Sequence, residues 1–224
     1  AGFSYTKEGA HSRARILHCK DMTGKEINSK LIAQVKELKN VSIFENSTLV
    51  DLLVAGDRCH GAVLRDQAGK LSNVYAQSTL LATGGIGGLF SKTTNFAHLT
   101  GDAIAIALKH GIRVKDLDYV QIHPTSLYTG RSGRAFLMSE SLRGEGAILV
   151  GKDGQRFADE LLPRDLLTKA IYTQMEKDRL PYVRMLLKGH VEGSIAGRFP
   201  GIHAHCLQEG YDLVEDYIPI VPAQ

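Results

Sequence analysis

The sequence predicts an α/β layer followed by an α+β region, and three observations indicate this fold class. A helical apolar stripe near the start is followed by several short strand-like runs separated by turn residues. A short apolar run then leads into a glycine cluster and a mainly apolar helix-like segment. After about residue 116 short strands and helices alternate irregularly. With 43% hydrophobic residues, the 224-residue chain can fill ordinary cores.

Composition excludes several classes of protein. The formal charge of +3 comes without a concentrated run of Lys and Arg, which argues against a nucleic-acid surface and suits small anionic ligands equally well. No run approaches the ~18 consecutive apolar residues of a membrane-spanning helix, and no signal peptide is evident, so the cytoplasm is the expected location. Cys19, Cys59 and Cys206 are far apart and outside any CxxC pair, so we expect three buried thiols.

Both ends of the chain suggest an internal piece of a larger protein. The first residue is Ala1 rather than Met, and residues 218–224 form an extended apolar segment without a polar tail.

The first half predicts a helix, a meander and a second helix. Residues 23–38 have capping-box spacing at Thr23 and Glu26. One apolar stripe follows that helix: Ile27, Leu31, Val35 and Leu38. Strands are predicted at 41–44, 49–54, 61–65 and 71–75, and they would form an antiparallel meander. A buried strand at 79–83 and a buried helix at 102–110, ending at Gly111, complete the α/β layer.

The second half predicts a strand, a hairpin and a helix. Alternation over residues 119–123 places Tyr119, Gln121 and His123 on one face, and Pro124 indicates that this strand ends at an edge or cleft. Residues 147–157 predict a hairpin around the turn at 151–154. Pro163 suits the first position of a helix. The apolar stripe of that helix is Leu166, Leu167, Ala170, Ile171 and Met175.

Glycines 84, 85, 87 and 88 follow the predicted strand, where missing side chains let backbone N–H groups approach an anion. The cluster does not match GxGxxG, because Phe90 occupies the last glycine position. Spacing alone favours a plain glycine turn over a cofactor contact.

Arg164 falls in the first turn of its helix, where the macrodipole disfavours a cation by about 0.3–1 kcal/mol. An anion should therefore compensate it. The spacing leaves two alternatives open: a neighbouring acid among Asp159, Glu160 and Asp165, or an anionic substrate.

Other polar residues have plainer interpretations. His123 alone is more often a satisfied structural histidine than a site residue. His203 and His205 lie near Cys206, but their spacing matches no standard metal site. The carboxylates around Arg143 predict a structural ion pair at a turn.

Many short motifs occur in a fixed order along the chain. They are Glu8-Gly9-Ala10-His11-Ser12-Arg13, Ala82-Thr83-Gly84-Gly85, Thr100-Gly101-Asp102, His123-Pro124-Thr125, residues 139–146 (SESLRGEG), residues 153–157 (DGQRF), Pro163-Arg164-Asp165 and residues 218–222 (IPIVP). In this order they resemble the L-aspartate oxidase branch of the succinate dehydrogenase/fumarate reductase flavoprotein family. The resemblance covers nearly the whole chain.

The resemblance implies two domains. Residues 1–116 would be part of an FAD-binding, Rossmann-like domain with a β-meander, lacking its N-terminal GxGxxG unit. Residues 117–224 would be the α+β capping domain that closes over a dicarboxylate. The residues implied near FAD are Ala82, Thr83, Gly84, Gly85 and Asp102.

The resemblance also implies roles at the substrate. Arg164 matches the family's catalytic arginine, while His123, Ser139 and Glu140 would bind the substrate carboxylates. Glu8 matches a position that is Glu in aspartate oxidases and uncharged glutamine in the dehydrogenases. It would accept a hydrogen bond from the α-ammonium group of aspartate. The alternative is a solvated Glu8 paired with a neighbouring cation.

The implied activity is oxidation of L-aspartate to iminoaspartate with O₂ or fumarate as acceptor, in NAD biosynthesis and coupled to quinolinate synthase. The fragment alone is expected to be inactive. One alternative is a flavoprotein subunit of succinate dehydrogenase or fumarate reductase, which shares most of these motifs. Another is a non-catalytic binding module that retains the cap.

Overall fold

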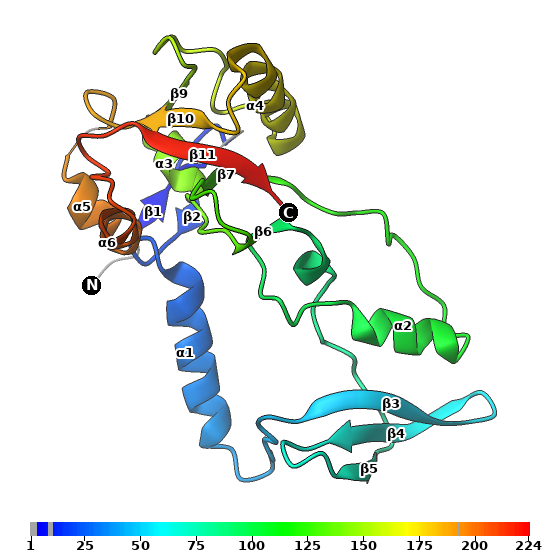
Figure 1. Ribbon diagram of the computed structural model, residues 1–224. Helices are drawn as coiled ribbons and strands as arrows, with labels where there is room; N and C mark the ends of the chain where they lie inside the picture. The colour runs from blue at the N-terminus through cyan, green and yellow to red at the C-terminus, as the bar shows by residue number, and fades with distance from the viewer. Residues whose placement is uncertain (1–3, 9–10, 192) are drawn as a thin grey trace. The chain divides into compact units, whose positions relative to one another are not determined.

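The computed structural model describes residues 4–8, 11–191 and 193–224 (Figure 1). The chain divides into two compact units, which are described separately. Unit 1 comprises residues 1–33, 90–95 and 121–224, and unit 2 comprises residues 34–89 and 96–120. No helix among the described residues is long and apolar enough to cross a membrane.

Unit 1 is built on a four-stranded antiparallel sheet (Figure 1). Its strands, in spatial order, are β7 (His123–Leu127), β11 (Ile218–Ala223), β10 (Val183–Leu186) and β9 (Ile148–Val150). Every residue of β11 is buried, although the strand contains two prolines. The register with β7 shifts between Val221 and Ala223, around Pro222, which has no N–H to donate.

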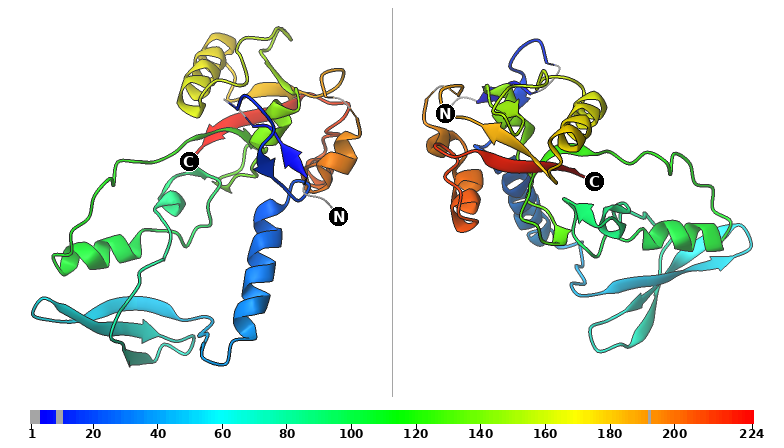
Figure 2. Two further views of the ribbon diagram at one scale, coloured as in Figure 1. Left: turned by 180° about the vertical axis from the view of Figure 1, so that it is seen from behind. Right: turned by 45° about the horizontal axis from the view of Figure 1, so that its top comes forward.

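Helix α4 (Arg164–Asp178) packs on β7, β10 and β11 through Leu167 and Ile171. Figure 2 shows this sheet and helix from two further sides. The other helices of the unit are α3 (Glu140–Gly144), α5 (Ile195–Arg198) and α6 (Pro200–Gln208). Their buried apolar residues, including Leu142, Phe199 and Ile202, join one core with the sheet. Packing in this core holds β7, α3 and the start of α4, the segments that carry the candidate site, in place.

Two short strand pairs and a further helix accompany the sheet. Strands β1 (Tyr5–Thr6) and β2 (Ile16–Leu17) pair antiparallel. Strands β6 (Lys92–Thr93) and β8 (Gly133–Arg134) pair in parallel. Helix α1 (Thr23–Lys36) has no buried residue.

Unit 2 contains the predicted meander, with strands β3 (Thr48–Ala55), β4 (Arg58–Arg65) and β5 (Leu71–Tyr75) in sequential antiparallel order. At Gly61 the strands approach so closely that a Cβ would lie 1.9 Å from the carbonyl oxygen of Val74. A single 3₁₀ turn, η1 (Gly87–Leu89), follows the glycine cluster. Helix α2 (Asp102–Lys109) ends before Gly111, as predicted, where φ is +67°.

Two predicted strands of the first half are wrong. Residues 41–44 and 79–83 are irregular, and Leu80 is 90% exposed. Both runs have strand-like composition, but neither is paired with another described segment in a ladder. The capping box is also wrong, because the Thr23 hydroxyl accepts from Cys19 N–H while Glu26 N–H donates to the Met22 carbonyl. The local sequence predicted these elements, but it could not show which residues are available as their hydrogen-bond partners.

Other predictions need smaller corrections. The strand expected at 119–123 begins at His123 instead of ending there, because β11 pairs with residues 123–127. Pro124 is tolerated because β7 lies at the sheet edge. The second arm of the hairpin is reduced to one bridge between Val150 and Arg156. Leu166 is exposed rather than part of the buried stripe, and Cys19 is exposed, so the three thiols are not all buried.

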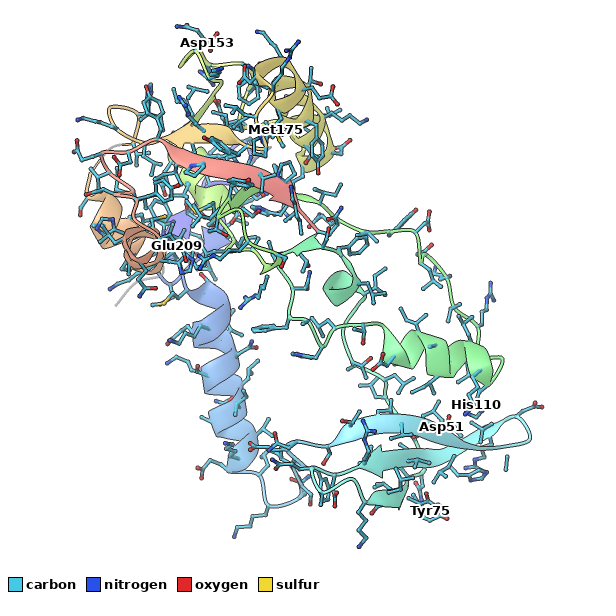
Figure 3. The ribbon with its side chains drawn as sticks, viewed as in Figure 1. Asp51, Tyr75, His110, Asp153, Met175 and Glu209 are labelled. Carbon is cyan, nitrogen blue, oxygen red and sulfur yellow. The ribbon has the colours of Figure 1, made fainter. Side chains whose placement is uncertain are left out.

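Asp51 links the meander to α2 within unit 2 (Figure 3). Its Oδ2 lies 2.5 Å from Lys109 Nζ, and its Oδ1 lies 2.6 Å from His110 Nε2. Leu52 N–H also donates to Oδ1, at 2.9 Å. These contacts, led by Lys109, hold the pKa of the Asp51 carboxyl well below its usual range. The ionised carboxylate therefore stabilises the contact between strand β3 and the end of α2.

We expect Asp51→Asn to speed amide hydrogen exchange in α2, with Asp57→Asn in the exposed β3–β4 turn as the matched control. Because folding lowers the pKa of Asp51, its contribution is present above the unfolded value of 3.8 and is lost as pH falls through the lower folded value. The difference from wild type should therefore persist at pH 4 and fade only in stronger acid. Equal exchange rates in the two variants would exclude this role for Asp51.

Candidate functional site

The central segment of the candidate site is α3. Ser139 caps the helix, because its hydroxyl accepts a hydrogen bond from Ser141 N–H at 3.2 Å. Glu140 follows as the first helical residue and is buried, with its side chain 10% exposed. A buried carboxylate requires partners.

Arg164, the first residue of α4, supplies the main partner. Its Nε and Nη2 lie 2.8 and 2.7 Å from Glu140 Oε2, and its Nη1 donates to Gln121 Oε1 at 2.6 Å. The compensating anion is thus none of the three neighbouring acids considered from the sequence, but Glu140, which lies 24 positions earlier. The Arg164 side chain remains 34% exposed, so it is accessible to a ligand.

Arg143, three residues after Glu140 in the same helix, is the second arginine near this carboxylate. Its side chain is fully buried, and its Nη2 is 3.8 Å from Glu140 Oε2. Nη1 donates to the Glu160 carbonyl at 2.6 Å, whereas Nε and Nη2 have no hydrogen-bond partner among the described residues. Burial lowers the pKa of Arg143, and Glu140 opposes that shift. The predicted ion pair at a turn is therefore a buried contact within a helix.

His123 begins β7 and is buried. Its Nδ1 lies 2.9 Å from the Thr125 carbonyl oxygen and 3.3 Å from Thr125 N. Burial lowers its pKa to about 4, and the charges of Arg164 and Arg143 act in the same direction. His123 is therefore a neutral side chain near neutral pH, oriented by the backbone of its own strand.

Glu8 is half-buried and faces α3. Ser141 Oγ donates to Glu8 Oε1 at 3.4 Å, and Glu8 is one of the charges that raise the pKa of Arg143. No ion pair joins Glu8 to Lys7 or Arg13 among the described residues. The structure therefore gathers all five residues expected at the substrate, including Ser139, within unit 1 around α3.

The sequence did not single out Gln121 and Ser141 as site residues. The alternation over 119–123 had placed Gln121 and His123 on one face, so a signal was present for Gln121. Ser141 carries no such signal, because its contact with Glu8 spans 133 positions.

The residues expected near a flavin belong to unit 2. The loop of Ala82, Thr83, Gly84 and Gly85 is exposed, and its backbone N–H groups donate to no other described residue. Gly84 has φ +80°, a backbone conformation that favours glycine, and a Cβ there would lie 2.8 Å from the end of the Leu99 side chain. Asp102, the first residue of α2, accepts from Thr100 Oγ1 at 2.8 Å. Exposed, unpaired N–H donors fit a cofactor with polar oxygens.

His205, one of the two histidines near Cys206, packs against an aromatic ring. His205 stacks on Phe136, with ring centroids 3.8 Å apart. The described part of the chain contains no cluster of His, Cys, Asp or Glu that could bind a metal ion.

Comparison with known proteins identifies the class. The sequence profile of the FAD binding domain matches residues 1–224, so the chain belongs to this family. FAD is therefore the cofactor, as expected, and the mixed helices and sheets are those of the FAD-binding domain of the succinate dehydrogenase/fumarate reductase flavoproteins.

Within that class, the chain is similar to L-aspartate oxidases. It is 45% identical to the Clostridium perfringens enzyme, covering 100% of this chain and 51% of the relative. It is 38% identical to L-aspartate oxidase 1 of Ralstonia nicotianae, covering 99% and 44%. A solved quinol-fumarate reductase with menaquinol molecules matches with a TM-score of 0.88 at 28% identity, over 98% of this chain and 42% of that one. The chain thus spans about half the length of these relatives.

We expect His123 to titrate near pH 4 in an NMR titration of histidine-labelled protein, with His123→Gln identifying its resonance. Between its ordinary value of 6.5 and about 4 the unfolded chain binds this proton and the folded chain does not. His123 therefore makes stability fall as pH drops through that range. A midpoint near 6.5 would show that the imidazole is not desolvated as the structure indicates.

Proposed function

We propose that the full-length protein is an FAD-dependent oxidase that converts L-aspartate to iminoaspartate, with O₂ or fumarate reoxidising the flavin, in NAD biosynthesis. In this proposal residues 1–116 belong to the FAD-binding domain and residues 117–224 to a capping domain. The observation that carries the proposal is the Arg164–Glu140 ion pair, together with the Glu8 carboxylate that contacts Ser141 of the same helix, α3. The 45% identity to an aspartate oxidase supports it.

The charges around α3 suit a dicarboxylate. Arg164, Arg143 and Glu140 together carry one net positive charge, which suits a carboxylate; the Glu8 carboxylate adds a negative charge, which suits an ammonium group, and the neutral His123 adds none. A guanidinium has five N–H groups, of which three on Arg164 are directed at Glu140 and Gln121. One N–H remains on each terminal nitrogen, so the guanidinium keeps two donors for a substrate carboxylate.

Arg164 binds and polarises the carboxylate in this proposal. Its guanidinium remains charged at any working pH, so a deprotonated form exists only transiently. Resemblance to the family would make Arg164 the proton donor when fumarate is reduced. His123 and Ser139 would orient the substrate through its carboxylates, and the backbone of β7 fixes His123 for this purpose.

Ala82, Thr83, Gly84, Gly85 and Asp102 would hold the flavin in the full-length protein. Bound FAD supplies the two-electron acceptor for the oxidation. The loop contributes exposed N–H donors, and Gly84 allows close approach because it carries no side chain.

The alternative is a flavoprotein subunit of succinate dehydrogenase or fumarate reductase, and the similarity to a quinol-fumarate reductase favours that alternative. Glu8 is the residue that distinguishes the two. Aspartate differs from succinate by an α-ammonium group, which requires an acceptor. Among the described residues, the one donor to the Glu8 carboxylate is Ser141, through a long hydrogen bond to Oε1, so lone pairs remain for an ammonium group. Transfer of the product to quinolinate synthase is a further part of the proposal.

The full-length protein should oxidise L-aspartate, and Glu8→Gln should weaken kcat/KM for that reaction by about 1.5–3 kcal/mol, the range for a lost charged hydrogen bond. Fumarate carries no ammonium group, so its reduction should change far less. Both rates are measured on one preparation. Glu26→Gln, on the exposed helix α1, is the matched control and should change neither.

Equal losses with both substrates would mean that Glu8 supports the fold or the flavin. Absence of aspartate oxidation, together with rapid succinate oxidation or fumarate reduction, would favour the alternative.

A further inference from the structure

The segment that carries Glu8 lies directly against the end of α3. At Gly144 a Cβ would lie 2.2 Å from the Lys7 carbonyl oxygen and 3.3 Å from Glu8 Cα, so only glycine permits this contact. Thr6 Oγ1 also donates to Glu145 Oε1, at 3.0 Å. The backbone before Glu8 is therefore fixed relative to the helix that carries Glu140.

The Glu8 side chain is fixed separately, by two serine hydroxyls in series. Ser139 Oγ donates to Ser141 Oγ at 3.2 Å, and Ser141 Oγ donates to Glu8 Oε1 at 3.4 Å. Ser141 is only 8% exposed. Its single O–H is directed at Glu8 and one of its lone pairs accepts from Ser139, so little of its hydrogen-bonding capacity remains for a ligand.

Without this hydroxyl, nothing directional would orient the carboxylate among the contacts the structure describes. The nearby guanidinium of Arg143 attracts Glu8, and its Nε and Nη2 have no other described hydrogen-bond partner. We expect a carboxylate that is free to rotate to turn toward that cation, because hydrogen bonds between two charged groups are stronger than those from a neutral hydroxyl. Glu8 would then be unavailable to a ligand.

We propose that Ser141 is a positioning residue that keeps the Glu8 carboxylate directed at the substrate's ammonium group, and that it thereby sets the preference for an amino-dicarboxylate over a plain dicarboxylate. This inference rests on the proposed role of Glu8. Ser139 has two functions here, because it caps α3 beside Glu140 and donates to Ser141. In this proposal, the groups that bind the carboxylate and the ammonium of the substrate are both held by the short helix α3.

The test uses the full-length protein loaded with FAD. Ser141→Ala should raise KM for L-aspartate by about 3- to 10-fold, since a long hydrogen bond to a charged group is lost. The value of kcat should stay within about twofold, and KM for fumarate should not change, because Ser141 affects only the group that meets the ammonium. Ser141→Cys, which keeps the volume but donates weakly, should behave like Ser141→Ala.

Ser126→Ala is the matched control. Ser126 is also a buried serine of unit 1, and its hydroxyl donates to the Val221 carbonyl at 2.7 Å, away from Glu8. It should leave KM for both substrates unchanged. Thermal melting of every variant detects a general loss of fold, and Ser141→Cys remains the informative variant if Ser141→Ala is unstable.

The double variant Ser141→Ala/Glu8→Gln separates positioning from a direct role. If Ser141 acts only through Glu8, adding Ser141→Ala to Glu8→Gln should change KM for L-aspartate by less than about twofold. Additive losses, equal losses with fumarate, or a Ser141→Ala variant that behaves like Ser126→Ala would each overturn the inference while leaving the proposed function intact. A full-length protein that does not oxidise L-aspartate would overturn both.

Discussion

The candidate site depends on one carboxylate, Glu140, which lies between two guanidinium groups. A buried carboxylate or guanidinium alone would cost several kcal/mol, and each is tolerated because the other is near. Arg164 is at a helix start, where a cation is disfavoured, and Arg143 is fully buried. Glu140 compensates both at once, and the remaining positive charge is available to an anionic ligand. Burial lowers the pKa of His123, and the charges on Arg164 and Arg143 lower it further, so this histidine stays neutral near neutral pH.

The four-stranded sheet of unit 1 is what brings these groups together. His123 begins β7 and Gln121 lies two residues before it, Glu140 comes from α3, and Arg164 comes from the first turn of α4. Arg164 is 43 positions from Gln121 and 24 from Glu140, so the contacts form only once the sheet and its helices have assembled. Helix α4 packs on the same sheet that β7 borders, and this packing fixes the distance between them.

The sequence predicted the parts of the fold that depend on local patterning. The meander, the end of α2 and the start of α4 follow from alternation, Gly111 and Pro163. It also identified Arg164 as a cation that needs an anion, but the partner could not be inferred, because Glu140 is distant in sequence. The strand predicted at 79–83 failed for a related reason. Strand-like composition specifies a strand only where a partner backbone is available for hydrogen bonding.

A double-mutant cycle on Arg164 and Glu140 tests this account most directly. Arg164→Lys, Glu140→Gln and the double variant would be compared by kcat/KM for L-aspartate in the full-length protein. Lysine keeps the charge but lacks the planar fork, and glutamine removes the compensating charge. If the pair acts as one unit, the double variant should lose little more than the worse single variant, with a coupling energy above about 1 kcal/mol. Losses that add to within about 0.5 kcal/mol would contradict the central role of Glu140.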